Sequence, residues 1–193
     1  MNAGKSTTLL QSSYNYQERG MDTLIYVPAI DDRYGRGVVT SRLGLQQKAE
    51  IVTKSMNLYT DIAAKYKQMH KLRCILVDEA QFLSKDQVRQ LGQVVDEFKL
   101  PVLAYGIRTD FQGEPFEGSL YLLAWADQLI ELKTICHCGG KATMILRLDG
   151  SGKVLRHGDQ VAVGGNESYV STSREHFYAG VASCEDSIPA CAK

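Results

Sequence analysis

The chain of 193 residues lacks any apolar run approaching the ~20 residues needed to span a bilayer, and it lacks the apolar stretch of a signal peptide. It also has no net charge, because 22 basic residues balance 22 acidic ones, so no global field would draw it to nucleic acid or an anionic membrane. No repeat or low-complexity segment is visible. We therefore expect a cytoplasmic folded protein whose phosphate contacts are local, without a nucleic-acid or membrane partner.

Cysteine is scarce as well, with five residues, an odd number that argues against a disulfide framework. Two of them, Cys136 and Cys138, flank His137 in a tight cluster that is typical of metal binding in a reducing compartment. A chain of this length forms one hydrophobic core, or one core domain with a small appendage. Its content of 44% hydrophobic and 23% charged residues is that of an ordinary globular protein.

The pattern of the chain changes near Thr134. Before this point, four short apolar runs predict strands that are mostly buried on both faces, as parallel strands are. These runs are residues 23–27, 74–77, 102–105 and 129–132. Helical patterns lie between them, at residues 6–19, 57–70 and 84–98. The alternation predicts an α/β domain over residues 1–133 with a mostly parallel sheet.

The part after Thr134 has a different character. Two cysteines, glycine pairs and turn signals surround a strand-like run at 142–148, which predicts a small β-rich lobe over residues 134–178. Residues 179–193 show no clear periodicity, and we expect them to form a loose tail.

Residues 2–7 read as the second half of a phosphate-binding loop, G-x-x-x-x-G-K-[ST], that runs directly into a helix. In such a loop Gly4 lets the backbone approach the phosphates, Lys5 reaches the β- and γ-phosphates, and Ser6 ligates Mg²⁺. A chance Gly-Lys-Ser ahead of a helix is the alternative. The sequence therefore indicates a nucleotide site, but this motif alone does not decide it.

A second motif supports the first. The apolar run 74–77 ends in Asp78 and Glu79, and an acidic residue at the carboxyl end of such a strand holds Mg²⁺ through water. A solvated acidic turn is the alternative, but two half-motifs in the correct order favour the nucleotide site. Phosphoryl transfer to an alcohol also needs a proton acceptor, usually a carboxylate. We assign that role of general base to Glu79.

These motifs give the sequence a resemblance to the thymidine kinase family of the cellular and bacterial type, over the whole chain up to about Tyr178. The segments that carry it are residues 1–6, 31–34, 78–82, 105–111 and 163–165, with Tyr169 and the cluster 136–138. The resemblance implies a P-loop NTPase-like α/β fold, with a small zinc-ribbon-like lobe and a lasso loop. It also implies transfer of the γ-phosphate of ATP to the 5′-hydroxyl of thymidine with Mg²⁺, in deoxynucleotide salvage for DNA synthesis. Feedback inhibition by thymidine triphosphate and a homotetramer are further implications.

The family's site residues match this chain position by position. The resemblance assigns ATP binding to Met1, Asn2, Ala3, Gly4, Lys5, Ser6, Asp78, Glu79, Ala80 and Gln81. Ser6 and Asp78 are the expected Mg²⁺ residues, and Glu79 matches the catalytic acid or base. Asp31 and Arg33 match a loop pair near the phosphates. The residues that resemble those around the thymine base are Phe111, Phe116, Gln160, Val161, Ala162, Val163, Gly164 and Tyr169. The residues alone leave simpler alternatives open. Arg33 could be a solvated loop arginine, Phe111 and Phe116 could be ordinary packing, and residues 160–164 could form a tight turn.

The family also ties the ends of its base-covering loop with one tetrahedral Zn²⁺. The matching positions here are Cys136 and Cys138, then Ser173 and His176, where Cys-x-x-His is expected. Serine is a poor zinc ligand because its hydroxyl stays protonated near neutral pH. We therefore expect an impaired zinc site with three good ligands. Water, His137 or the tail thiols Cys184 and Cys191 could complete it, and the alternative is that no metal binds.

Other interpretations concern the whole chain. One alternative is a catalytically weak relative that binds nucleotide or assembles with intact subunits. Another is a P-loop ATPase, against which the balanced charge argues. The phosphate loop begins at Met1, whereas such a loop needs a preceding strand to aim its backbone. We therefore expect the sequence to lack about one strand, either through a start codon assigned too late or through gene erosion.

Overall fold

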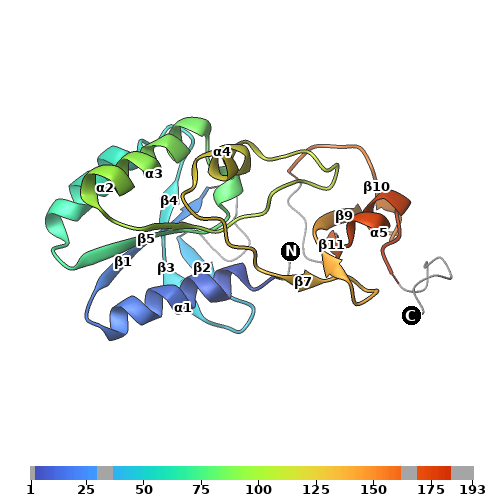
Figure 1. Cartoon of the computed structure of the whole chain (residues 1–193), viewed down its shortest axis with the longest axis horizontal. Coiled ribbons are helices and arrows are strands. Elements are labelled where there is room, and N and C mark those ends of the chain that lie inside the picture. The colour runs from blue at the N-terminus through green and yellow to red at the C-terminus, as the bar shows by residue number, and fades with distance from the viewer. Residues whose placement is uncertain (1–2, 30–36, 162–168, 184–193) are drawn as a thin grey trace. The chain divides into compact units, whose positions relative to one another are not determined.

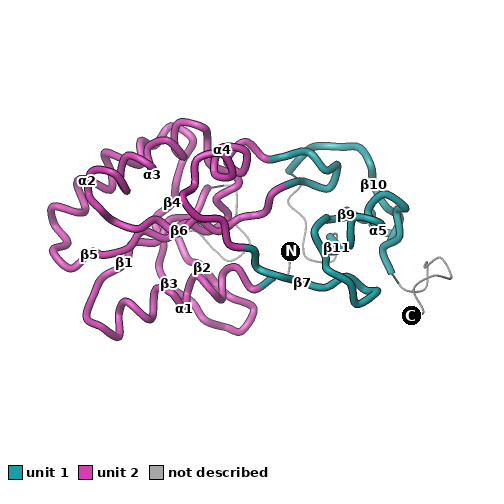
Figure 2. The backbone as a smooth tube through the Cα atoms, viewed as in Figure 1, with its two compact units in different colours: residues 1–3, 109–115, 131–193 teal, residues 4–108, 116–130 magenta. Residues whose placement is uncertain are grey.

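A computed structural model describes residues 3–29, 37–161 and 169–183 of the chain. The chain folds into two compact units, which are coloured separately in Figure 2. The larger unit comprises the described parts of residues 4–108 and 116–130. The smaller unit comprises the described parts of residues 1–3, 109–115 and 131–193.

The larger unit is built on a parallel four-stranded sheet in the order β4-β1-β5-β6 (Figure 1). Its strands are β1 (Asp22–Pro28), β4 (Glu50–Val52), β5 (Leu72–Val77) and β6 (Val102–Ala104). A short antiparallel hairpin of β2 (Val38–Thr40) and β3 (Gln46–Lys48) lies in the same unit. With the β-rich smaller unit described below, this architecture confirms the predicted fold class.

Helices cover both faces of this sheet, with α2 and α3 on one side and α1 on the other (Figure 1). The helices of the larger unit are α1 (Lys5–Glu18), α2 (Leu58–Gln68), α3 (Lys85–Phe98) and α4 (Glu117–Trp125), with a 3₁₀ turn, η1 (Ala80–Phe82). Side chains alternate along a strand, so Leu24 and Tyr26 of β1 pack with α2 and α3, whereas Ile25 and Val27 pack with α1. Each such side chain contributes about 1.5–3 kcal/mol on burial.

The helices begin where the sequence provides caps. The side chain of Asn57 accepts a hydrogen bond from the backbone N–H of Thr60 and so caps α2. Ser84 and Gln87 form a capping box at the start of α3, the helix expected at residues 84–98. The amide of Gln87 also donates to the carbonyls of Thr53 and Met56, which fixes α3 against the segment before α2. Local capping and long-range packing therefore specify the same helix start.

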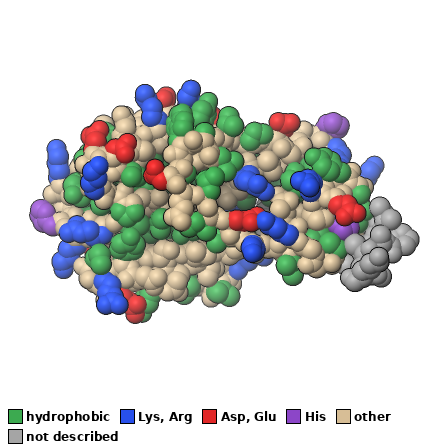
Figure 3. Space-filling model, viewed as in Figure 1, with side chains coloured by type: hydrophobic (Ala, Val, Ile, Leu, Met, Phe, Trp, Pro, Cys, Tyr) green, Lys and Arg blue, Asp and Glu red, His purple; other side chains and the backbone are tan. Residues whose placement is uncertain are grey.

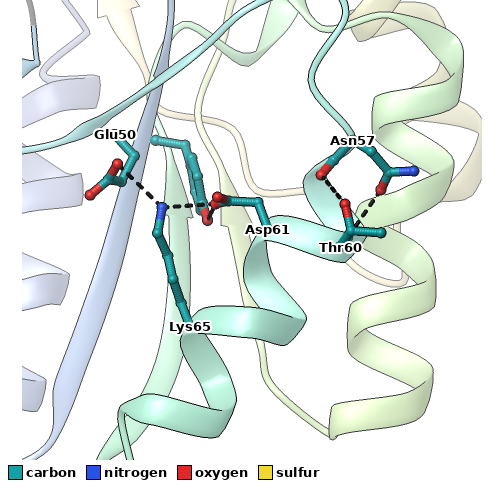
Figure 4. A network of polar contacts seen from close by, with 6 residues as sticks. Glu50, Asn57, Thr60, Asp61 and Lys65 are labelled. Atoms are coloured by element: carbon teal, nitrogen blue, oxygen red, sulfur yellow. Dashed lines mark hydrogen bonds and ion pairs between the residues drawn. The ribbon is translucent and has the colours of Figure 1, made fainter.

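A polar network joins α2 to the edge of the sheet (Figure 4). Lys65 lies between two carboxylates, with its Nζ 2.8 Å from Asp61 and 3.2 Å from Glu50. Asp61 also accepts a 2.6 Å hydrogen bond from the hydroxyl of Tyr26, whose side chain is fully buried. Burial, together with the Asp61 carboxylate, raises the pKa of Tyr26, so this residue stays a hydrogen-bond donor.

The smaller unit is mostly antiparallel. Its three-stranded sheet has the order β10-β9-β11, and a two-stranded ribbon pairs β7 with β8. The elements are β7 (Thr134–Ile135), β8 (Lys141–Ala142), β9 (Met144–Leu148), β10 (Val154–Leu155), β11 (Tyr169–Thr172) and α5 (Arg174–Ala179). The strand-like run expected at 142–148 corresponds to β9. Most of the expected tail, from residue 184 onward, lies outside the described residues.

One expectation about secondary structure was wrong, and one helix was not predicted. Residues 129–132 form no strand, and the side chains of Leu129 and Ile130 are exposed. A strand is stabilised by its pairing partner, and in the described part of the chain β6 is hydrogen-bonded only to β5. The sequence also gave no sign of α4, because its apolar side chains are not confined to one face. Among the described residues, no helix has the length and apolar character required to cross a membrane.

Candidate functional site

The N-terminus of α1 has the features of a helix end that binds anions. The helix begins at Lys5 and has no acidic residue in its first turn, so its free N–H groups and dipole keep their positive potential. Gly4 precedes it with φ 75°, a left-handed conformation that favours glycine. Of the other loop residues expected to bind ATP, Ala3 is half-buried, whereas Met1 and Asn2 lie outside the described residues.

The first turn of α1 is joined to the end of β5. The hydroxyl of Ser6 donates a 2.8 Å hydrogen bond to Oδ2 of Asp78, the first residue after the strand. Hydroxyl and carboxylate oxygens are hard ligands of the kind that Mg²⁺ prefers. The two residues expected to hold Mg²⁺ are therefore side by side, and their chemistry fits that ion.

Asp78 is almost fully buried, and this determines its electrostatics. Burial, reinforced by the neighbouring charge of Glu79, raises the pKa of Asp78 to about 6. Hydrogen bonds from Ser6 and from the N–H of Glu79 and the charge of Lys5 oppose that rise without cancelling it. A bound cation would favour the ionised form, because an opposite charge lowers the pKa of a carboxyl group.

Glu79 has an unusual backbone. Its φ is 48° although it is not glycine, and such conformations cost of order 1–3 kcal/mol and cluster at functional sites. The amide of Gln81 donates a 2.5 Å hydrogen bond to its carboxylate, and the N–H of Ile107 donates to Oε1 of Gln81. The N–H of Ala80 donates to the carbonyl of Tyr105. Residues 78–81 are therefore held between β5 and the segment that follows β6.

Glycines permit the close packing around this turn. A Cβ on Gly118 would lie 2.5 Å from the carbonyl oxygen of Ala80 and 2.8 Å from that of Leu83. A Cβ on Gly106 would lie 2.9 Å from Oε1 of Gln81. Any larger residue at these positions would have to displace backbone or a buried amide. The position of Glu79 is therefore supported by packing from α4 and from the segment after β6.

The two phenylalanines expected at the thymine ring are both buried, in different units. Phe116 precedes α4 in the larger unit and contacts Phe82 edge to face, with ring centroids 5.6 Å apart. Phe111 lies in the smaller unit, where the guanidinium of Arg147 lies over its ring at 5.2 Å. The burial of both rings is explained by ordinary packing as well as by a role at the thymine ring.

A buried carboxylate organises the loop around Phe111. Asp110 accepts hydrogen bonds from the backbone N–H groups of Gln112 and Glu114, and from the side-chain amide of Gln160 at 3.0 Å. The family resemblance points to Gln160 but assigns no role to Asp110. The sequence does indicate a turn here, because Asp110 comes just before Gln112 and Gly113 and aspartate often begins a turn. It does not indicate the contact with Gln160, which lies 50 residues further along the chain.

Two of the remaining residues expected at the base lie in the described part of the chain. Val161 is partly exposed, and Tyr169 is half-buried in β11 opposite Arg147 of β9. The other positions lie outside the described residues: Asp31, Arg33, Ala162, Val163 and Gly164.

The smaller unit holds a cluster with metal-ligand chemistry. Cys136, Cys138 and His176 place their ligand atoms within 4.8 Å of one another. Burial, the largest influence, opposes ionisation of the Cys136 thiol, but hydrogen bonds from Cys138 and Ser173 together lower its pKa. Two thiols and an imidazole fit Zn²⁺, which prefers sulfur and nitrogen ligands. Ser173 lies beside them as the N-cap of α5.

Comparison with known proteins agrees with this geometry. The family model for thymidine kinase matches residues 1–177. A thymidine kinase of Shewanella oneidensis is 63% identical over 177 residues, which cover 92% of each chain. A thymidine kinase of Coxiella burnetii is 62% identical over 180 residues, covering 93% of this chain and 92% of its own. One from Pasteurella multocida is 62% identical over 182 residues, or 94% of each chain. This chain belongs to the thymidine kinase family.

Proposed function

We propose that this protein transfers the γ-phosphate of ATP to the 5′-hydroxyl of thymidine, giving thymidine monophosphate for DNA synthesis. The observation that carries the proposal is the hydrogen bond between Ser6 and Asp78 beside Glu79, at the N-terminus of α1. It occurs in a chain that aligns over nine-tenths of its length with proteins named thymidine kinase. The site supplies a phosphate-binding end, a cation-binding pair and a proton acceptor together.

The phosphate end of the site combines backbone and side-chain charge. Residues 1–6 would surround the phosphates, with the N–H groups of α1 and the ammonium of Lys5 offsetting their negative charge. Ser6 and Asp78 would hold Mg²⁺, which when bound neutralises charge on the phosphate oxygens. Asp31 and Arg33 would lie near the transferred group, where a guanidinium stabilises developing charge.

Glu79 is the residue that we assign to the acceptor hydroxyl. A carboxylate within hydrogen-bond reach of the 5′-hydroxyl orients its oxygen and takes its proton as the bond to phosphorus forms. The hydrogen bond from Gln81 would keep the Glu79 carboxylate oriented, and Ala80 and Gln81 complete the ATP-binding segment. The positive φ of Glu79 also supports this role, because strained backbone conformations cluster at functional sites.

Recognition of the base would fall on the aromatic and loop residues. Phe111 and Phe116 would form the walls around the thymine ring, while main-chain groups of residues 160–164 and Tyr169 would read its polar edge. The hydrogen bond between Gln160 and Asp110 supports this part of the proposal, because it anchors the start of that loop to the Phe111 segment.

The test is a transfer assay with the full chain. Incubation with γ-labelled ATP, Mg²⁺ and each of the four deoxynucleosides in turn should label thymidine monophosphate in preference to the other products. Release of labelled phosphate at the same rate without any nucleoside would indicate an ATPase instead. Nucleotide binding without either product would indicate a relative that has lost catalysis.

We further propose that the protein assembles as a homotetramer and works in the cytoplasm. Exposed apolar side chains on α4 support self-association, namely Leu120, Leu123 and Trp125. Basic and acidic side chains are interspersed on the face shown in Figure 3, which suits a protein contact better than a nucleic-acid one. The free thiols of Cys74, Cys136 and Cys138 fit a reducing compartment. Sedimentation equilibrium would give the number of subunits.

A further inference from the structure

In the cluster of Cys136, Cys138 and His176, two ligand atoms are already as far apart as they would be in a tetrahedral zinc site. A zinc–sulfur bond of ~2.3 Å and a zinc–nitrogen bond of ~2.0–2.1 Å place the two ligand atoms about 3.6 Å apart in a tetrahedron. Sγ of Cys136 lies 3.7 Å from Nδ1 of His176. Cys138 lies within 4.8 Å of both, so three corners of a site are in place. A closed structural site needs a fourth.

The family resemblance implies a metal ligand at position 173. The hydroxyl of Ser173 instead makes hydrogen-bond contacts with His176. Its hydroxyl oxygen accepts the backbone N–H of His176 at 3.2 Å and so caps α5. The same oxygen lies 2.8 Å from Nδ1 of His176. A hydroxyl that stays protonated near neutral pH and caps a helix is a poor donor to a cation.

We propose that His137 supplies the fourth ligand, giving a Cys2His2 site made of Cys136, His137, Cys138 and His176. Nδ1 of His137 lies 3.5 Å from Sγ of Cys136, which is again the edge of a tetrahedral site. The ring of His137 lies 4.5 Å, centroid to centroid, from the ring of His176. The two imidazole rings are therefore neighbours, and His137 lies beside the three residues whose ligand atoms are within 4.8 Å of one another.

The backbone explains how three consecutive side chains reach one centre. In an extended segment His137 would point away from both of its neighbours, because successive side chains alternate. Here the segment turns back on itself: the N–H of Gly139 donates to the carbonyl of Cys136, and Gly139 has φ 80°. The N–H of Cys136 donates to the carbonyl of Gly140. The turn thus presents the side chains of residues 136–138 toward α5.

Other donors in the described part of the smaller unit are less suitable. His157 is exposed in the loop after β10. The remaining cysteines of this unit, Cys184 and Cys191, lie outside the described residues, so the experiment must compare them with His137 directly.

Metal binding to the full chain tests the proposal without any reference to kinase activity. The affinity for Co²⁺ and Zn²⁺ is measured by competition with a chromophoric chelator, and the Co²⁺ absorption bands report tetrahedral geometry and the number of thiolates. Changes in outer groups alone cost ~10–100-fold in metal affinity, so loss of a direct ligand in His137→Ala should cost at least about 100-fold. The matched control His157→Ala, and also Ser173→Ala and the double variant Cys184→Ser/Cys191→Ser, should bind as the starting protein does.

A rescue variant separates loss of a ligand from loss of folding. Ser173→Cys introduced into His137→Ala should restore the affinity and add the absorption of a third thiolate. Unchanged binding by His137→Ala would overturn the proposal. It would also be overturned by a large loss of affinity in Ser173→Ala or in Cys184→Ser/Cys191→Ser, or by the absence of one tetrahedral metal in the starting protein.

Discussion

The hydroxyl of Ser6 donates a 2.8 Å hydrogen bond to the carboxylate of Asp78, although the two residues are 72 positions apart. The bond joins the first turn of α1 to the end of β5, and the same two elements also pack through buried apolar side chains. Asp78 is 5% exposed and follows directly on the buried strand. The pKa of Asp78 therefore depends on its burial and on the charges beside it.

We predict that Asp78 lowers the stability of the metal- and nucleotide-free protein as pH rises. Its pKa is about 6 in the folded state against an ordinary value of 3.8, so the folded state binds the proton more tightly. The contribution is fully favourable below about pH 4 and is lost as pH rises through about 6. The free energy of unfolding of the starting protein should therefore fall between pH 4 and pH 7, relative to that of Asp78→Asn, by about 2–3 kcal/mol. Urea unfolding in EDTA between pH 4 and 7.5 measures it, and parallel profiles for both proteins would contradict it.

A second prediction concerns the buried hydroxyl of Tyr26. Tyr26→Phe removes a hydrogen bond to the charged acceptor Asp61, which should lower the free energy of unfolding by about 1–3 kcal/mol. The matched control is Tyr59→Phe, which removes the same kind of bond, to Glu97, at an exposed site and should cost at most about 1 kcal/mol. Chemical denaturation of the three proteins at pH 7 compares them, and equal losses would show that burial is not the deciding factor.

Gly118 provides a test of how packing supports the turn at residues 78–81. The Cβ of Gly118→Ala would lie 2.5 Å from the carbonyl of Ala80, so the turn must shift, at a cost of about 1–3 kcal/mol. Turnover should fall more than this loss of stability explains, because the carboxylate of Glu79 moves with the turn. Gly92→Ala in α3 is the control: its Cβ meets nothing within 4 Å, and it should stabilise the helix by about 0.5–1 kcal/mol. Normal turnover in Gly118→Ala would separate this packing from the chemistry.

Much of the larger unit could be predicted from local pattern. Strands β1 and β5 are continuous apolar runs because both of their faces are buried, and α3 begins at a capping box that the sequence spells out with Ser84 and Gln87. The run at 129–132 is also mostly apolar but forms no strand, since composition does not supply a pairing partner. Helix α4 was missed because its leucines and Trp125 are partly exposed and do not form a single apolar stripe.

The site shows the same division between local and long-range information. The order of the two nucleotide motifs predicted that Ser6 and Asp78 belong to one site, and the described structure places them in hydrogen-bond contact. The role of Asp110 could not be predicted, because its partner Gln160 lies 50 residues away and only the folded chain brings them together. The left-handed backbone of Glu79 could not be predicted either, because glycine is the residue expected at a positive φ.

The assignment of Glu79 as general base is the central claim, and Glu79→Gln tests it most directly. The amide keeps the size of the side chain and its contact with Gln81 but removes the proton acceptor. Lys5→Ala serves as the contrast, because it should weaken ATP binding and turnover together. The deciding measurement is the rate of phosphate transfer from labelled ATP to thymidine at saturating substrates, with the ATP dissociation constant measured in parallel. The account predicts that Glu79→Gln loses at least about 10²–10⁴-fold in turnover while binding ATP nearly as before. Turnover within a few-fold of the starting protein would contradict it.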